Sequence, residues 1–209
     1  MSGIAIIGAG GHGRVIASIL QASNAEVAGF IDSGVKADLS FPLLGDDGDI
    51  PRLKGEGTIT SFIIGLGSIK GGSSLRAKLF DQMIVHGLTP SVAIHPMAIL
   101  SPGVKIGAGC AVMAGAIVNT GTSIGKNSII NTGAIIDHDG DIGEHVHIAP
   151  GVTLSGNVTI GDNSLIGVGS TIRQGISIGK DVTLGAGSVV VKNITNGVTA
   201  FGNPAGLSK

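Results

Sequence analysis

The chain has 209 residues, which is enough for one large domain or two small ones. Its net charge of −1 excludes the basic surface that nucleic acids or anionic membranes require, so we expect neither as a partner. Its mean hydropathy is +0.48, yet it has no run of about 18 apolar residues and thus predicts no membrane-spanning helix. One cysteine and no signal-peptide pattern predict a cytoplasmic protein.

Residues 1–92 are expected to form a small α/β domain. In chain order, the patterns predict a strand over 4–7, a glycine turn over 8–13, a helix over 15–21, strands over 26–31 and 61–64, a helix over 74–85 and an extended segment over 88–92. Residues 33–61, rich in Gly and Asp, predict irregular chain with a short strand near 41–44. Strands that alternate with helices indicate a parallel, Rossmann-like sheet.

From residue 93 on, every sixth position is aliphatic. The seventeen positions are Ile94, Leu100, Ile106, Val112, Val118, Ile124, Ile130, Ile136, Ile142, Ile148, Leu154, Ile160, Ile166, Ile172, Ile178, Leu184 and Val190. This period fits neither a helix nor an alternating strand, but it fits a chain wound into a three-sided prism, with one repeat unit on each side of every coil. Residues 93–209 are therefore expected to form a second domain, in which 192–209 are a cap with a turn at 202–204.

Three motifs carry a family resemblance. They are the repeated aliphatic-Gly pairs such as Ile106-Gly107, the turn Gly8-x-Gly10-Gly11-His12-Gly13 with the segment 131–139, and Gly202-Asn203-Pro204-Ala205. Together they resemble the sialic acid/sugar O-acyltransferase-like group of hexapeptide-repeat acyltransferases, which includes N-acetyltransferases of nucleotide-linked 4-amino-4,6-dideoxy sugars of the bacillosamine and perosamine type. The resemblance implies a left-handed parallel β-helix, a homotrimer, and acetyl-CoA bound between adjacent prisms.

His138 is the candidate general base. Acyl transfer needs a group that takes the proton of the acceptor, and His138 lies between Asp137 and Asp139, whose carboxylates can fix its tautomer. The resemblance places the base at His138 and its acidic partner at Asp139. The local sequence by itself fits a solvated polar corner equally well.

Four further residues are candidates for binding acetyl-CoA. The resemblance assigns His147, Val168 and Ala186 to the groove between adjacent prisms that binds acetyl-CoA. Gly156 follows His138 by three repeat units, so it stacks one coil above it, where a missing side chain leaves room for a thioester. His147 lies half a coil from His138, so the two can share a site only between two subunits. The alternatives are that His147 only packs at a corner of the prism and that Gly156 only forms a turn.

The glycine turn and Asp32, at the end of the next predicted strand, match the dinucleotide fingerprint. About 90 residues provide only one mononucleotide half, so a nucleotide-linked sugar is the better hypothesis than NAD. The candidate residues are Gly10, Gly11, His12, Gly13, Asp32, Gly65, Gly67 and Ser68. A turn that only packs a helix on a strand is the alternative.

These features predict an acetyl-CoA-dependent N-acetyltransferase of a nucleotide-linked amino sugar, with O-acetylation of a sugar such as sialic acid as the nearest alternative. A zinc hydratase on the same prism would need His138, His145 and His147 as ligands, but these lack a fitting register, so no metal is expected. A non-catalytic nucleotide-binding scaffold is the third hypothesis. Cys110 occupies a position of the repeat that usually holds a small residue, and we expect it to pack in the core.

Overall fold

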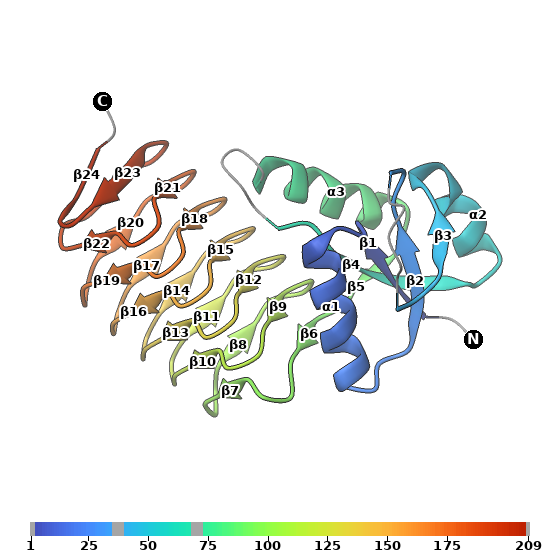
Figure 1. The fold of residues 1–209 in the computed structure, drawn as a ribbon, viewed down its shortest axis with the longest axis horizontal. Coiled ribbons are helices and arrows are strands. Elements are labelled where there is room, and N and C mark those ends of the chain that lie inside the picture. Colours follow the sequence, from blue (N-terminus) through green and yellow to red (C-terminus); the bar gives the residue numbers. More distant parts are fainter. Residues whose placement is uncertain (1–2, 35–39, 68–72, 208–209) are drawn as a thin grey trace.

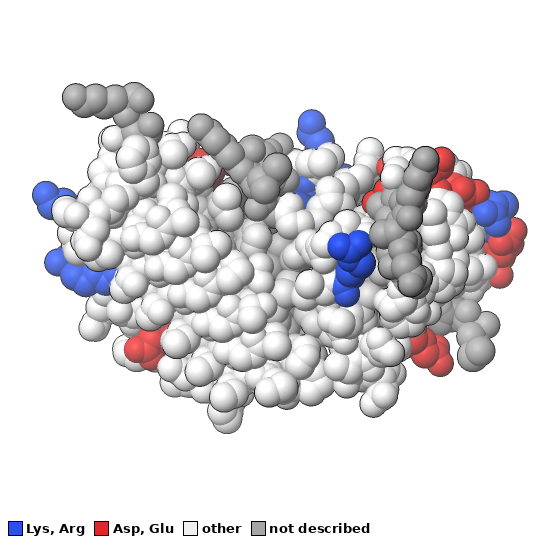
Figure 2. All heavy atoms as spheres, viewed as in Figure 1, with Lys and Arg blue, Asp and Glu red and all other residues white. Residues whose placement is uncertain are grey.

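The computed structural model describes residues 3–34, 40–67 and 73–207. An N-terminal α/β unit adjoins one end of a long stack of short strands, and the C-terminus lies at the far end of this stack (Figure 1). Charged side chains gather around α2 at the outer end of the α/β unit, whereas few lie on the visible face of the stack (Figure 2). No helix of the described ranges combines the length and the apolar character that a bilayer-spanning helix needs.

The N-terminal unit is built on a parallel sheet with the strand order β3-β2-β1-β4-β5. Its strands are β1 (Gly3–Ile7), β2 (Val27–Ile31), β3 (Leu43–Gly45), β4 (Ile59–Ile64) and β5 (Thr89–Pro90). Its helices are α1 (Gly11–Ala22), the short 3₁₀ turn η1 (Asp47–Asp49), α2 (Ile50–Gly55) and α3 (Ser73–Val85). The expected alternation of strands and helices, and the parallel sheet that follows from it, are confirmed.

The helices cover both faces of this sheet. Ile16 and Leu20 of α1 share a buried cluster with Met113 and Ile129 of the stacked strands, so α1 is packed between the sheet and the stack. On the opposite face, Phe80 of α3 lies in a cluster with α2 and the sheet. Because both faces of the parallel sheet are covered, its central strands β1 and β4 are mainly apolar.

The expectation of irregular chain over residues 33–61 was wrong for 47–55, where η1 and α2 form. The side chain of Asp46 accepts a hydrogen bond from the Gly48 amide at 2.8 Å and begins the turn. Ile50 and Leu53 then lie one helical turn apart and are buried on the sheet. The Asp- and Gly-rich composition hid these two apolar residues, because a helix of six residues is too short for a periodic signal.

The stack is the expected left-handed parallel β-helix. Its strands have two residues each, and the second residue of every strand is one of the seventeen predicted aliphatic positions. They are β6 (Ala93–Ile94), β7 (Ile99–Leu100), β8 (Lys105–Ile106), β9 (Ala111–Val112), β10 (Ile117–Val118), β11 (Ser123–Ile124), β12 (Ile129–Ile130), β13 (Ile135–Ile136), β14 (Asp141–Ile142), β15 (His147–Ile148), β16 (Thr153–Leu154), β17 (Thr159–Ile160), β18 (Leu165–Ile166), β19 (Thr171–Ile172), β20 (Ser177–Ile178), β21 (Thr183–Leu184) and β22 (Val189–Val190). Ile136 pairs with Leu154, which confirms a coil of three repeat units.

Small side chains two positions before the aliphatic residues join successive coils. The hydroxyl of Ser128 donates to the carbonyl oxygen of Gly143 at 2.9 Å, and that of Ser164 donates to Gly179 at 2.8 Å. Cys110 makes the equivalent contact with the Gly125 carbonyl at 3.0 Å. The Cys110 thiol is fully buried, and burial raises its pKa to about 11. Its position is that of a core residue of the repeat.

The three sides of the prism point different residues outward. The side formed by β8, β11, β14, β17 and β20 is polar, because Lys105, Ser123, Asp141, Thr159 and Ser177 face out. The side that begins with β6, β9 and β12 is covered by α1 at that end and carries His147 beyond it. The third side, with β7, β10, β13, β16, β19 and β22, exposes a stripe of isoleucines that we call the isoleucine stripe: Ile99, Ile117 and Ile135.

The far end of the prism is closed by a hairpin. Strand β23 (Thr199–Gly202) adds in parallel to β21, and β24 (Ala205–Leu207) returns antiparallel to β23. Of the predicted turn, Gly202 ends β23, and Asn203 and Pro204 connect it to β24. The cap thus pairs backbone groups that an open end would expose.

Candidate active site

His138 lies at the corner between β13 and β14, and two carboxylates flank it. Its Nδ1 is 2.9 Å from Oδ2 of Asp139, and its backbone amide donates to Oδ1 of Asp137 at 2.8 Å. Asp137 is itself held by the side-chain amide of Asn119 at 3.0 Å. Because Nδ1 is engaged with a carboxylate, the proton lies on Nδ1 and the lone pair on Nε2, where it can accept a proton. His138 is about half exposed, so a ligand can reach it.

The two carboxylates also set the protonation equilibrium of the imidazole. The hydrogen bond to Asp139, followed by the charge of Asp137, raises the pKa of His138 above its ordinary value of 6.5. Asp139 adopts the left-handed backbone conformation, with a φ of 58°, which Asp tolerates better than most residues do. This conformation turns the chain sharply after His138, beside whose ring the Asp139 carboxylate then lies.

We expect Asp139→Asn to move the acid limb of the pH profile of kcat/KM to lower pH. The carboxylate stabilises the imidazolium, so its loss lowers the pKa of His138, and the neutral base persists at lower pH. The plateau should fall at least about tenfold, because the amide no longer fixes the Nδ1–H tautomer. Stopped assays over a pH series measure both effects. If the acid limb stays at the same pH, it does not report the titration of His138.

Gly156 lies one coil above His138, as expected. The amide of the next residue, Asn157, donates to the carbonyl oxygen of His138 at 2.8 Å. A Cβ atom on Gly156 would lie 2.5 Å from both Cε1 and Nε2 of His138, so the absent side chain makes room for the imidazole ring. The ring of His138 thus explains why residue 156 is a glycine. A contact between Gly156 and acetyl-CoA stays a prediction.

Gly156→Ala is therefore expected to lower kcat by roughly tenfold to a hundredfold by displacing the ring of His138. The backbone of Gly156 is not in the left-handed region, so alanine introduces no φ strain there. The double variant Gly156→Ala/His138→Ala should unfold at the same temperature as His138→Ala alone, since no ring remains to collide. Unchanged kcat in folded Gly156→Ala would show that the ring has room elsewhere.

Three of the predicted acetyl-CoA residues line one groove. His147 on β15, Val168 and Ala186 border a cavity of about 400 Å³ whose walls are mainly apolar. Its further lining includes Pro150, Ala149, Leu165, Gly167, Thr183, Leu184 and Gly185. The sequence analysis missed Pro150, although it lies one coil before Val168 and shares its corner. His147 is nearly buried, and its Nε2 is 3.0 Å from Nδ2 of Asn131.

The groove and His138 lie at two different corners of one prism. The corner after β13 carries His138, and the corner before β16 and β19 carries Pro150 and Val168. The side between these two corners is the one that bears the isoleucine stripe. The structure therefore brings His147, Val168 and Ala186 together and leaves His138 with Gly156 apart from them within one chain.

The glycine turn is held tightly at Gly8 and Gly13 and is open at Gly10 and Gly11. Gly8 adopts a φ of +103°, and a Cβ on Gly13 would collide with the Gly8 carbonyl, so both positions need glycine. Gly10 and Gly11 face open space at the N-terminus of α1, where a ligand can approach the backbone. Asp32 accepts hydrogen bonds from the amides of Ala9 and Gly34, both at 2.8 Å. Thus Asp32 ties the turn to the end of β2, and it also borders a hollow of about 140 Å³.

His12 faces the prism rather than this hollow. Its ring lies 6.4 Å from that of His147, centroid to centroid. Burial, followed by the charges of Arg76 and His147, lowers the pKa of His12 to about 3, so it is neutral at pH 7. Gly65 and Gly67 lie beneath the turn, and a Cβ on Gly67 would lie 3.7 Å from Cγ of His12. Ser68 lies outside the described residues.

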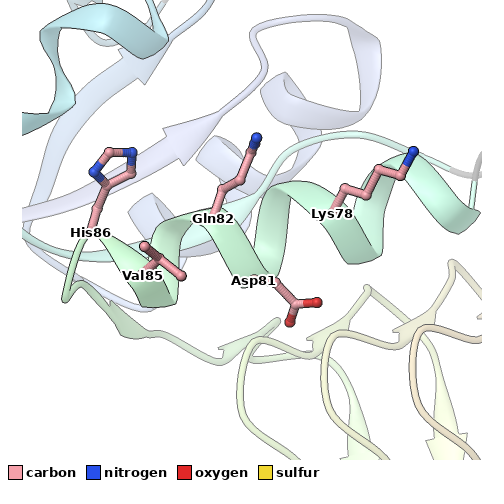
Figure 3. Close-up of a pocket in the computed structure, with 5 residues that line it drawn as sticks. All are labelled: Lys78, Asp81, Gln82, Val85 and His86. Carbon is pink, nitrogen blue, oxygen red and sulfur yellow. The ribbon is translucent and has the colours of Figure 1, made fainter.

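A second hollow lies beside α3. It is lined by Lys78, Asp81, Gln82, Val85 and His86, and Figure 3 shows these side chains spread along the helix rather than converging. It contains none of the predicted site residues. In the described parts of the chain, no three His, Cys, Asp or Glu side chains are grouped to hold a metal ion.

Fold and site together define a hexapeptide-repeat acyltransferase with an N-terminal α/β unit. Residues 3–83 match the PglD N-terminal domain, residues 103–138 and 157–192 match the hexapeptide repeat of succinyl-transferase, and residues 139–174 match the bacterial transferase hexapeptide. A comparison with curated proteins finds no match.

Solved structures are similar over the whole chain. A histidine mutant of perosamine N-acetyltransferase from Caulobacter crescentus, in complex with CoA and GDP-perosamine, is 38% identical with a TM-score of 0.94, covering 100% of this chain and 98% of that one. The acetyltransferase domain of PglB from Neisseria gonorrhoeae, in complex with acetyl coenzyme A, is 36% identical with a TM-score of 0.91, covering 98% of each chain. WeeI from Acinetobacter baumannii is 26% identical with a TM-score of 0.85, covering 100% of both chains.

The chain belongs to the sugar N-acetyltransferases that join a PglD-type N-terminal domain to a hexapeptide-repeat prism. The expectations of family, fold class and acetyltransferase activity are thereby confirmed.

Proposed function

We propose that this enzyme transfers the acetyl group of acetyl-CoA to the 4-amino group of a nucleotide-linked 4-amino-4,6-dideoxy sugar. The observation that carries the proposal is the full-length similarity to a perosamine N-acetyltransferase that holds CoA and GDP-perosamine. An amine acceptor is favoured over the hydroxyl of an O-acetyltransferase, because that relative is an N-acetyltransferase. The free, buried thiol of Cys110 agrees with action in the cytoplasm.

The proposed chemistry uses His138 as the general base. Nε2 of His138 takes a proton from the acceptor amine as the amine nitrogen attacks the thioester carbonyl of acetyl-CoA. The C–S bond then breaks, the amide forms, and the coenzyme A thiolate leaves and is protonated. Asp139 holds the imidazole through Nδ1 and stabilises the imidazolium that forms, as its 2.9 Å contact and the raised pKa of His138 support.

We further propose that the active enzyme is a homotrimer with a site between neighbouring prisms. Ile99 is 59% exposed and Ile135 is 37% exposed, and outward isoleucines on successive coils are typical of a surface that a partner covers. Packing these sides around a threefold axis sets the corner of His138 from one chain beside the groove of His147 and Val168 from the next. The pantetheine arm of acetyl-CoA would lie in that groove, with Ala186 and Gly156 along its path.

The N-terminal domain, residues 1–92, is proposed to bind the nucleotide part of the acceptor. The diphosphate would lie against Gly10, Gly11 and the N-terminus of α1, where backbone amides and the helix dipole favour an anion. His12, neutral at pH 7, faces the prism and would contact the sugar rather than pair with a phosphate. Asp32 and Gly65 would border the nucleoside.

The experiment is a thiol-release assay with acetyl-CoA and a panel of UDP- and GDP-linked sugars, with and without a 4-amino group. We expect coenzyme A release with one 4-amino sugar and none with the matching 4-hydroxy sugar, and an amide in the product by NMR. Release with the 4-hydroxy sugar, and an ester product, would indicate an O-acetyltransferase. If the trimer binds nucleotide sugars but releases no coenzyme A with any of them, the protein is a non-catalytic nucleotide-binding scaffold.

A further inference from the structure

A buried arginine joins the two domains. Arg76 of α3 is 1% exposed, and its guanidinium donates to the carbonyl oxygen of Leu66, in the loop after β4. The same guanidinium donates to the backbone carbonyl oxygen of Asn127 at 2.7 Å and to its side-chain Oδ1 at 2.9 Å. One side chain thus ties a loop of the N-terminal domain to a corner of the prism.

Asn127 returns the interaction. Its side-chain amide donates to the carbonyl oxygen of Arg76 at 3.3 Å and lies 2.9 Å from Nδ1 of His145, one coil further along the prism. His145 packs edge-on against Phe80 of α3, with ring centroids 5.9 Å apart. Asn127 and His145 both adopt left-handed backbone conformations, with φ of 53° and 57°. Arg76 and Phe80 of α3 therefore both contact this corner of the prism.

The charge of Arg76 has no acidic partner among the described residues. All its hydrogen bonds there go to carbonyl or amide oxygens, and its Nε is buried with no acceptor. Burial lowers the pKa of Arg76 to about 10, which still leaves the group charged at pH 7. A buried charge without a counter-ion is costly for stability, so an apolar residue would serve better if this position only filled space.

The loop that Arg76 holds lies directly beneath the glycine turn. The amide of Gly65 donates to the carbonyl oxygen of Ile7 at 2.8 Å, and a Cβ on Gly65 would lie 2.5 Å from the carbonyl oxygen of Gly8. Gly67 packs beside the ring of His12. At Gly65 the loop meets the turn with no room for a side chain, so a shift of Gly65 moves the turn that carries His12.

We propose that Arg76 is a positioning residue for the acceptor substrate: it fixes the loop of residues 65–67, and through it the glycine turn and His12, relative to the prism that carries His147. The inference rests on the proposed function for the identity of the two substrates. The fork of the guanidinium suits this role, because it reaches two sites in fixed directions, which the single ammonium of lysine cannot do.

The test compares Arg76→Lys and Asn127→Gly with the matched control Asn163→Gly. Asn163 lies two coils beyond Asn127 on the same corner with a φ of 61°, and glycine keeps the left-handed backbone at both positions. We expect Arg76→Lys and Asn127→Gly to raise KM for the nucleotide sugar by roughly tenfold to a hundredfold and to leave KM for acetyl-CoA within about twofold. Asn163→Gly should change neither constant.

Hydrogen exchange of the ligand-free trimer gives a second measurement that does not depend on the substrates. We expect faster exchange of the amides of 8–13 in Arg76→Lys and Asn127→Gly, and unchanged exchange in Asn163→Gly. Unchanged exchange and KM in folded variants, or equal changes of both KM values, would overturn the role of Arg76. Absence of any coenzyme A release by the wild-type trimer would instead overturn the proposed function, while the exchange result still decides the role of Arg76.

Discussion

His138→Ala is expected to lower kcat by about 10²- to 10⁴-fold, the usual contribution of a general base. Nε2 of His138 carries the lone pair, since Nδ1 is held 2.9 Å from Asp139. Alanine removes that acceptor and leaves the corner intact, because the ring is about half exposed and fills no core position. KM for both substrates should change little. The measurement is steady-state coenzyme A release, with trimer content checked by size-exclusion chromatography.

The matched control is His86→Ala at the end of α3, in the hollow that holds no predicted site residue (Figure 3). This variant should keep wild-type kcat. His138→Asn adds a second comparison, because it keeps a polar side chain without a basic nitrogen, and it should be as inactive as His138→Ala. Near-normal turnover in both folded His138 variants would show that His138 is not the general base. The rate acceleration would then come from orientation of the two substrates.

Two inactive variants are expected to restore activity when their subunits are mixed. His138→Ala lacks the base, and Ala186→Trp fills the groove of about 400 Å³. If each site combines His138 from one chain with the groove of the next, random mixing leaves one site in four with both parts intact. Unfolding and refolding the two variants together should therefore recover about a quarter of the wild-type activity per site.

The mixture must be compared with each variant refolded alone and with the double variant His138→Ala/Ala186→Trp mixed with wild type. The latter mixture should also keep only about a quarter of its sites, because a site needs both parts from wild-type chains. A mixture that stays inactive, although its trimers contain both variants by mass spectrometry, would place the complete site within one chain.

The repeat could be predicted from the sequence because its information is local and redundant. From β9 on, each two-residue strand buries its second residue, and Ile94, Leu100 and Ile106 of the first coil are partly buried against the same core, so the core side chain recurs at every sixth position. Stacking the coils joins these residues into one continuous core. By contrast, α2 was missed, since its only apolar signal is Ile50 and Leu53 within a polar, glycine-bounded segment.

Part of the candidate site followed from the same register. His138 and Asp139 are adjacent in sequence, so their contact needs no tertiary information. Val168 and Ala186 are one coil apart and line the same groove. Gly156 was correctly stacked on His138, yet its closeness to the imidazole depends on the rotamer of that ring, which no pattern of residues specifies.

The sequence by itself determined the prism, the parallel sheet, the glycine turn and the pairing of His138 with Asp139, because each depends on a period or on neighbours along the chain. Only the tertiary structure decided how the two domains meet. Arg76 and Asn127 are 51 residues apart, and Arg76 lies outside the repeat, so no periodicity in the sequence pairs them. Their contact forms because packing α1 and α3 against the prism excludes water from Arg76, which must then satisfy its donors on the nearest carbonyl and amide oxygens.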